Sequence, residues 1–142
     1  MGILPCLHPD IFSLVNDVKM LEKFIEYSDP AAMKLCVDVA FLATADIPMA
    51  KFIKEHKKRI GAVHLRDIKP LAAKRKKGDM GPKYQTVELG KGTLQLEDFV
   101  DTLLDVEFSG WATVELEKGS KSLQQQAIAS HHYAAQTLDL VL

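Results

Sequence analysis

The stretch Ile60–Asp67, which reads IGAVHLRD, is a short apolar run that ends in a histidine, an arginine and an aspartate. A near-continuous apolar run of this length is typical of a parallel strand that is covered on both faces. Polar side chains at the carboxyl end of such a strand lie at the edge of the core, where parallel α/β proteins bind ligands. The stretch therefore predicts a strand buried on both faces, with His64 and Arg66 at a ligand-binding edge.

Two other predicted strands end in the same way, because residues 35–39 carry Asp38 and residues 111–116 carry Glu115. The carboxyl ends of parallel strands meet at one edge of a sheet, so we expect Asp38, His64 and Glu115 to converge on one site. Two carboxylates and an imidazole suit a divalent metal such as Mn²⁺, Mg²⁺, Zn²⁺ or Fe²⁺. Polar residues at strand ends can also serve only to cap helices and turns, and the sequence leaves both interpretations open.

Apolar residues recur at helical spacing after each predicted strand. A first strand within residues 2–7 is followed by a helix that has Ser13 as its expected N-cap and that ends at residues 28–30. Asp46 is the expected N-cap of the next helix, which has Pro48 in its first turn.

The second half of the chain continues the alternation. Residues 66–92 are predicted to be irregular, and a helix is expected over residues 96–104. Ser122 and Gln125 form the capping box of a last helix. Four strands, each followed by a helix, indicate an α/β fold with a parallel sheet, and we assign residues 1–142 to a single domain. No Gly-x-Gly-x-x-Gly motif follows the first strand, which argues against a Rossmann domain.

The composition excludes several classes of partner. The chain has 142 residues and a formal net charge of -1, which gives no reason to expect nucleic acid or an acidic membrane. No apolar run approaches the roughly 20 residues of a membrane span, and the amino terminus does not resemble a signal peptide. Cys6 and Cys36 are predicted to be free thiols, and a cytoplasmic location is expected.

Further residues extend the predicted edge. His8 follows the first strand and belongs either to the site or to a turn, and Arg66 is a candidate ligand for a substrate carboxylate or phosphate. Asp67 is interpreted as the partner of Arg66 on an exposed loop. The basic residues 74–77 attract an anionic sugar derivative or simply face solvent. Trp111 is expected to pack in the core or at the edge of a barrel.

Four motifs occur in the chain in a recognisable order: LCVD (35–38), VHLRD (63–67), LGKG (89–92) and GWATVE (110–115). Together they resemble the carboxyl-terminal half of the xylose-isomerase-like TIM barrels, from His8 to the last helix. That family contains sugar-phosphate isomerases and epimerases, inosose dehydratases and the endonuclease IV fold. The resemblance implies four consecutive βα units, the second half of a (β/α)8 barrel.

A half barrel would expose two sheet edges and an apolar inner face, which natural proteins avoid. We therefore expect self-association into a homodimer or a higher homo-oligomer that closes the barrel.

The resemblance also implies a site. In the family a glutamate, an aspartate, a histidine and a second glutamate bind a divalent metal, and the last three match Asp38, His64 and Glu115. Glu115 would double as the acid/base in proton transfer next to a carbonyl, while His8 and Arg66 would contact the substrate. The first metal glutamate is expected to precede the chain, and Phe41 stands where the family often has a histidine.

Two functions from different classes follow. One is a metal-dependent isomerase, epimerase or dehydratase that acts on a sugar or cyclitol. The alternative is a non-catalytic truncated barrel that oligomerises and at most binds a small polyol or anion. An endonuclease-like phosphodiesterase is less favoured, because such sites need more histidine and aspartate ligands than this chain offers.

Overall fold

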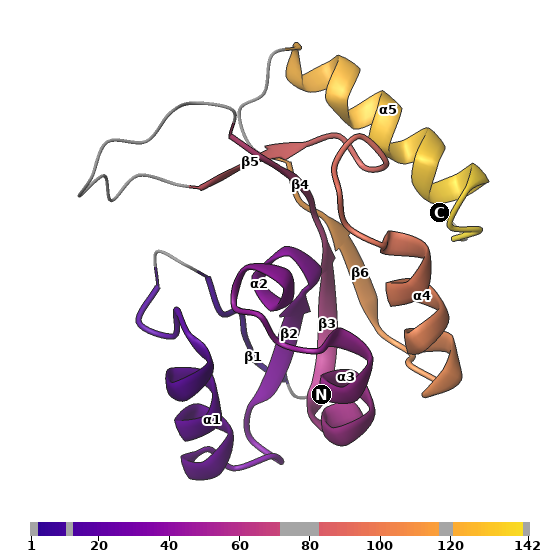
Figure 1. Ribbon diagram of the computed structural model, residues 1–142. Coiled ribbons are helices and arrows are strands. Elements are labelled where there is room, and N and C mark those ends of the chain that lie inside the picture. The colour runs from indigo at the N-terminus through magenta and orange to yellow at the C-terminus, as the bar shows by residue number, and fades with distance from the viewer. Residues whose placement is uncertain (1–2, 11–12, 72–82, 117–120, 141–142) are drawn as a thin grey trace, which may run out of the picture.

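The computed structural model describes residues 3–10, 13–71, 83–116 and 121–140. Its main sheet confirms the predicted parallel arrangement, with each strand hydrogen-bonded in parallel to the next (Figure 1). The strands occur in the spatial order β1 (Cys6–Leu7), β2 (Lys34–Asp38), β3 (Ile60–Leu65) and β6 (Trp111–Val114). All four carboxyl ends therefore lie at the same edge of the sheet.

Helices separate the successive strands of the main sheet, as predicted, and a last helix follows β6. They are α1 (Val18–Tyr27), α2 (Val39–Thr44), α3 (Met49–His56), α4 (Leu96–Asp105) and α5 (Leu123–Gln136), with a short 3₁₀ turn η1 (Lys57–Arg59). The short helix α2 was not expected. The fully buried residues Leu35, Ile53 and Phe99 represent the core that forms where these helices pack on the sheet.

Two of the predicted helix starts are wrong. Asp17 rather than Ser13 caps α1, because its Oδ1 accepts a hydrogen bond from Met20 N at 2.8 Å. The Ser13 hydroxyl instead donates to the backbone oxygen of Asp10 at 2.9 Å in the preceding turn. Asp46 has a positive φ of 54°, which places it outside a helix, so α3 starts after Pro48. The capping box of Ser122 and Gln125 is confirmed at the start of α5.

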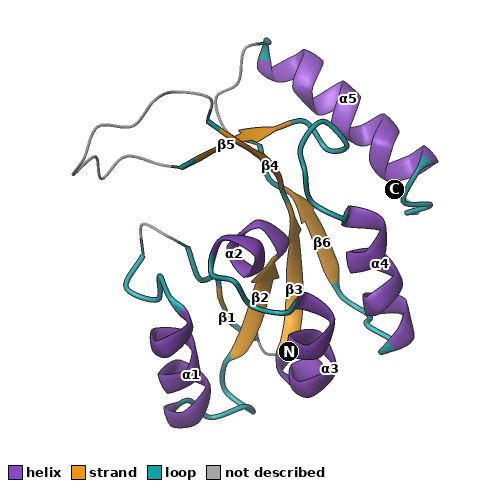
Figure 2. Cartoon of the chain, in the orientation of Figure 1, coloured by secondary structure: helices purple, strands orange, loops and turns teal. Residues whose placement is uncertain are grey.

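The sequence predicted an irregular stretch over residues 66–92, and this prediction is wrong for part of it. It contains an antiparallel hairpin of β4 (Asp67–Pro70) and β5 (Tyr84–Val87), which Figure 2 shows beyond the carboxyl end of β3. Charged residues and a proline at the outer end of this hairpin weakened the strand pattern. The basic residues 74–77 lie outside the described residues.

The two faces of the sheet differ in burial. Val63 and Leu65 are fully buried on the face that packs against the helices, whereas Ala62 and His64 on the other face are half-buried. The prediction that this strand is buried on both faces is therefore wrong. Trp111 pairs with Ala62 in register and is 82% exposed, because β6 is an outer strand of the sheet. The predicted packing of Trp111 in the core is wrong for the same reason.

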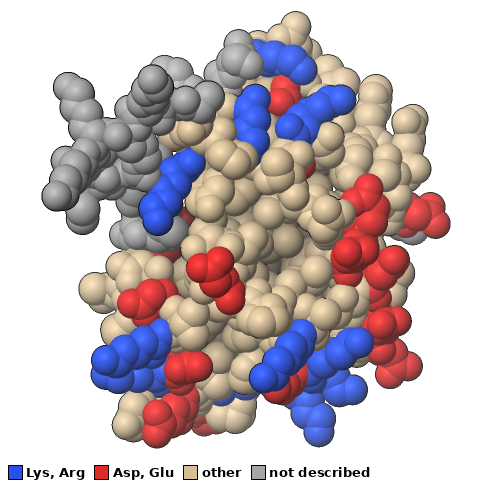
Figure 3. Space-filling model, in the orientation of Figure 1, with Lys and Arg blue, Asp and Glu red and all other residues tan. Residues whose placement is uncertain are grey.

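The remaining composition-based expectations concern thiols and charge. Both cysteines are free, and burial raises the pKa of the Cys36 thiol to about 12. Charged side chains of both signs are spread over the face seen in Figure 3, with acidic groups gathered over α4. Within the described parts of the chain, no helix combines the length and the apolar character that a membrane span requires.

Candidate metal centre

The carboxyl ends of all four parallel strands contribute to one cluster. His8 follows β1, Asp38 ends β2, His64 lies near the end of β3, and Glu115 follows β6. One potential ligand atom from each of these residues lies within 4.8 Å of all the others. The structure thus brings together the three residues predicted as ligands, and it adds His8 as a fourth.

Short contacts link the two imidazole rings to the two carboxylates. His8 Nε2 lies 3.1 Å from Asp38 Oδ2, and His64 Nδ1 lies 2.6 Å from Glu115 Oε2. His8 Nε2 also approaches Glu115 Oε2 at 3.8 Å. The two rings themselves are in contact, with centroids 4.3 Å apart. Each carboxylate is therefore held by at least one histidine.

Asp38 serves the fold and the cluster with different oxygen atoms. Its Oδ1 accepts hydrogen bonds from the backbone N–H groups of Ala40 at 2.7 Å and Phe41 at 3.1 Å, and so caps α2. Its Oδ2 faces His8. The family often has a histidine at the position of Phe41. The Phe41 side chain is buried in the core.

The pKa values of Asp38 and His8 shift in opposite directions. Burial alone would raise the pKa of Asp38, but the hydrogen bond with His8, the charge of Arg66 and two backbone N–H groups together lower it. The same hydrogen bond raises the pKa of His8, against the effect of its own burial. The pair is therefore stabilised as carboxylate and imidazolium.

Arg66 lies against the carboxylates of the cluster. Its Nε is 3.2 Å from Asp38 Oδ2, its Nη2 contacts Glu115 Oε1, and its Nη1 is 3.4 Å from Asp10 Oδ2. Asp10 was not predicted as a site residue. It follows His8 by two residues in the loop after β1, and its carboxylate reaches the same guanidinium from there.

Asp67 is not on an exposed loop, and this part of the prediction is wrong. Its side chain is buried, and its two oxygens accept hydrogen bonds from the backbone N–H groups of Ile68, Gly90, Gly92 and Leu94 at 2.8–3.3 Å. Asp67 therefore fastens the loop that contains the LGKG motif to the end of β3, next to Arg66. A Cβ atom at Gly92 would collide with Asp67 Oδ1, which explains the glycine.

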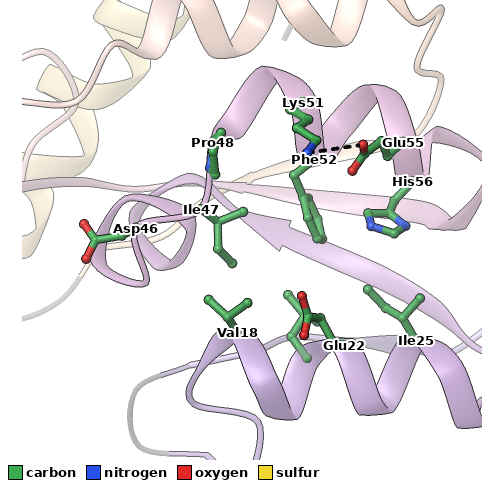
Figure 4. Close-up of a pocket in the computed structure, with 11 residues that line it drawn as sticks. Val18, Glu22, Ile25, Asp46, Ile47, Pro48, Lys51, Phe52, Glu55 and His56 are labelled. Atoms are coloured by element: carbon green, nitrogen blue, oxygen red, sulfur yellow. Dashed lines mark ion pairs between the residues drawn. The ribbon is translucent and has the colours of Figure 1, made fainter.

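A separate pocket of about 290 Å³ lies between α1 and α3 (Figure 4). Apolar side chains such as Val18, Ile25 and Phe52 line it, and acidic groups such as Glu22 and Glu55 flank them. It contains none of the four residues of the cluster, so it plays no part in the candidate metal centre.

The donor set of the cluster fits a divalent metal. Atoms bound to one ion at about 2.1 Å are at most about 4.2 Å apart, so a spread of 4.8 Å requires only small side-chain movements. Two imidazole nitrogens and two carboxylate oxygens suit Zn²⁺, Mn²⁺ or Fe²⁺ better than Mg²⁺, which prefers oxygen alone.

A parallel sheet with helices packed on it, and polar side chains gathered at the carboxyl ends of its strands, defines part of a TIM barrel with its ligand-binding edge. Comparison with known families agrees with this class. The chain belongs to the xylose isomerase-like TIM barrel family, whose model matches residues 5–138.

Solved structures show the same fold at low sequence identity. The chain is similar to L-ribulose 3-epimerase, with a TM-score of 0.69 and 16% identity over 97% of this chain and 48% of the other. It is similar to IOLI protein with a bound zinc atom, with a TM-score of 0.67 and 14% identity over 94% of this chain and 47% of the other. A third similar structure is the xylose isomerase domain protein from Planctomyces limnophilus, with a TM-score of 0.61 and 21% identity over 84% of this chain and 42% of the other. The chain thus spans less than half the length of these structures. Among curated proteins no match is found.

Proposed function

We propose that His8, Asp38, His64 and Glu115 hold a divalent metal, and that the chain acts on a sugar or cyclitol as an isomerase, epimerase or dehydratase. The observation that carries this proposal is the approach of four ligand atoms, one from each parallel strand end, to within 4.8 Å. Membership of the family, and the similarity of the chain to an epimerase and to a zinc-containing protein, support the proposed substrate class and the proposed metal.

His8 takes the fourth ligand position in this proposal. The resemblance gave His8 a role in substrate binding and placed the first metal glutamate ahead of the chain. The 3.1 Å contact with Asp38 Oδ2 favours ligation instead, because the imidazole nitrogen already faces the oxygen that the metal would share. Arg66 keeps its role as a candidate contact for an anionic or hydroxylated substrate.

Glu115 is the candidate acid/base. A bound divalent metal would polarise a substrate carbonyl and so lower the barrier to removing a proton from the neighbouring carbon. The Glu115 carboxylate is part-exposed at the edge of the sheet, and its contacts with His64 and Arg66 fix its position. It could accept the proton from the substrate carbon and return it to the same or the adjacent carbon.

The experiment that tests this function combines metal analysis with isotope exchange. Purified protein is expected to contain Mn²⁺, Zn²⁺ or Fe²⁺, and His64→Ala is expected to lose it. Glu115→Gln is expected to abolish the exchange of solvent deuterium into a ketose or inosose. His56→Ala, which changes a histidine outside the cluster, should leave both properties intact. If the bound metal persists unchanged in both site variants, the proposed centre is wrong.

The second candidate is a binding protein without catalysis. The contacts of Arg66 with Asp38 and Glu115 favour binding of a polyol, because neighbouring guanidinium and carboxylate groups can exchange hydrogen bonds with hydroxyl groups. Polyol binding by calorimetry, together with deuterium exchange that is no faster than without protein, would support this candidate over the enzyme.

We also propose that two copies of the chain associate. The sheet has β1 and β6 as its outer strands, and Trp111, Ala112 and Thr113 on β6 are exposed. A twofold axis along the barrel would pair β6 of each copy with the partner's β1 and give eight parallel strands. Light scattering that shows a stable monomer at micromolar concentration would contradict this arrangement.

A further inference from the structure

The position of Arg66 has a consequence for metal binding. Asp38 Oδ1 is taken by the backbone N–H groups of Ala40 and Phe41 at the start of α2. Oδ2 is therefore the oxygen that Asp38 can offer to a metal without losing the cap of α2. Arg66 Nε lies 3.2 Å from that same oxygen.

The surroundings of Arg66 increase the repulsion between its guanidinium and a metal ion at Asp38 Oδ2. Its side chain is only 10% exposed and it lies among the carboxylates of Asp10, Asp38 and Glu115. In such a partly buried setting, charges interact more strongly than they do in water. A guanidinium also remains charged at any ordinary pH, so Arg66 cannot lose its charge when another cation enters.

We propose that Arg66 competes with the divalent metal for Asp38 Oδ2 and thereby limits the metal affinity of the centre. This inference rests on the proposed function. On metal binding, Asp38 Oδ2 would leave both the His8 ring N–H and the guanidinium, while Arg66 would keep its contacts with Asp10 and Glu115. The competition lowers the affinity for each divalent metal, because every such ion carries the same charge towards the guanidinium.

The test measures Mn²⁺ binding to the full chain by calorimetry after removal of bound metal with a chelator. Arg66→Gln, which removes the charge, is expected to bind Mn²⁺ at least about tenfold more tightly than the unmodified chain, because like charges no longer repel. Arg59→Gln is the matched control. Arg59 hydrogen-bonds to Ser28 Oγ at 2.6 Å and to the backbone oxygen of Ile25, outside the cluster, so its loss should not change Mn²⁺ affinity.

The outcomes separate this inference from the proposed function. If the unmodified chain binds Mn²⁺ and His64→Ala does not, the metal centre stands. Equal or weaker binding by Arg66→Gln would then overturn the competition alone. Binding by Arg66→Gln where the unmodified chain shows none would support it, and no binding by either would overturn both proposals. Should Arg66→Gln fail to fold, Arg66→Met, which removes the charge but keeps most of the length of the side chain, must bind Mn²⁺ more tightly than the unmodified chain, or the inference fails.

Discussion

Asp38 and His64 are paired in register on neighbouring parallel strands, β2 and β3, so their side chains emerge on the same face of the sheet at the same height. His8 and Glu115 reach the same place from the outer strands β1 and β6. Each of the four strands thus supplies one group. The cluster is a product of strand order and register, since no local motif contains more than one of its members.

Replacement of His8 tests whether it is a ligand or a substrate contact. His8→Ala is expected to weaken Mn²⁺ or Zn²⁺ binding by about 100-fold or more, because even residues that only support a ligand cost about 10–100-fold. Calorimetry on the metal-free protein measures this change. His56→Ala, which changes a ring that packs on Phe52, is the control. Unchanged metal affinity together with weaker polyol binding would return His8 to the role of a substrate contact.

The stability of the metal-free protein should depend on pH through the pair of Asp38 and His8. The pKa of Asp38 is lowered, so its contribution is present above its ordinary value of 3.8 and is lost as the pH falls through the lowered pKa. The pKa of His8 is raised, so its contribution is present below 6.5 and is lost as the pH rises through the raised pKa.

Urea denaturation over a range of pH should therefore find the full stabilisation by this pair between pH 3.8 and pH 6.5, and His8→Ala should remove it. Metal binding should respond in the opposite sense at the alkaline limit. Loss of the His8 proton frees its nitrogen, so Mn²⁺ affinity should increase as the pH rises through the raised pKa of His8. A pH profile of stability that is the same in His8→Ala would contradict this account.

Asp67→Asn should destabilise the fold. The buried carboxylate accepts four backbone hydrogen bonds, and an amide would direct an NH₂ group at some of the same donors. We expect a loss of about 2–4 kcal/mol in the free energy of unfolding. Urea denaturation measures it, with the exposed Asp101→Asn as the matched control. A loss no larger than that of Asp101→Asn would show that the fastening of the loop contributes little.

Trp111→Arg should weaken self-association. If β6 pairs with a second copy, the exposed indole becomes buried there, and loss of such a residue costs about 2 kcal/mol or more at each of the two equivalent interfaces, roughly a 1,000-fold change in the dimer dissociation constant. Light scattering over a dilution series measures that constant. Leu123→Arg, at a 68% exposed position on α5, is the control and should leave it unchanged. Equal constants for the two variants would place the interface away from β6.

The sequence predicted the parts of this structure that local patterns determine. Apolar runs that end in Asp38 and His64 identified the strands and their shared edge, because burial and polarity change within a few residues. Asp67 was misassigned because its partners Gly90, Gly92 and Leu94 lie 23–27 residues further along the chain. No local pattern records such contacts.

Two other features depended on the order of the strands in space. His8 joins the cluster because β1 pairs with β2, and Trp111 is exposed because β6 is an outer strand. The sequence suggests that the strands are parallel, but it does not say which of them have a neighbour on only one side.

The two oxygens of Asp38 have separate tasks, and this restricts what protein engineering can do with the centre. Lengthening the side chain, as in Asp38→Glu, would carry the carboxylate away from Ala40 N and Phe41 N, so any gain in reach towards a metal would loosen α2. Bidentate coordination of the ion by Asp38 would likewise take Oδ1 away from the cap of α2. Efforts to alter metal preference are therefore better directed at His8 or Glu115, whose side chains cap no helix among the described residues.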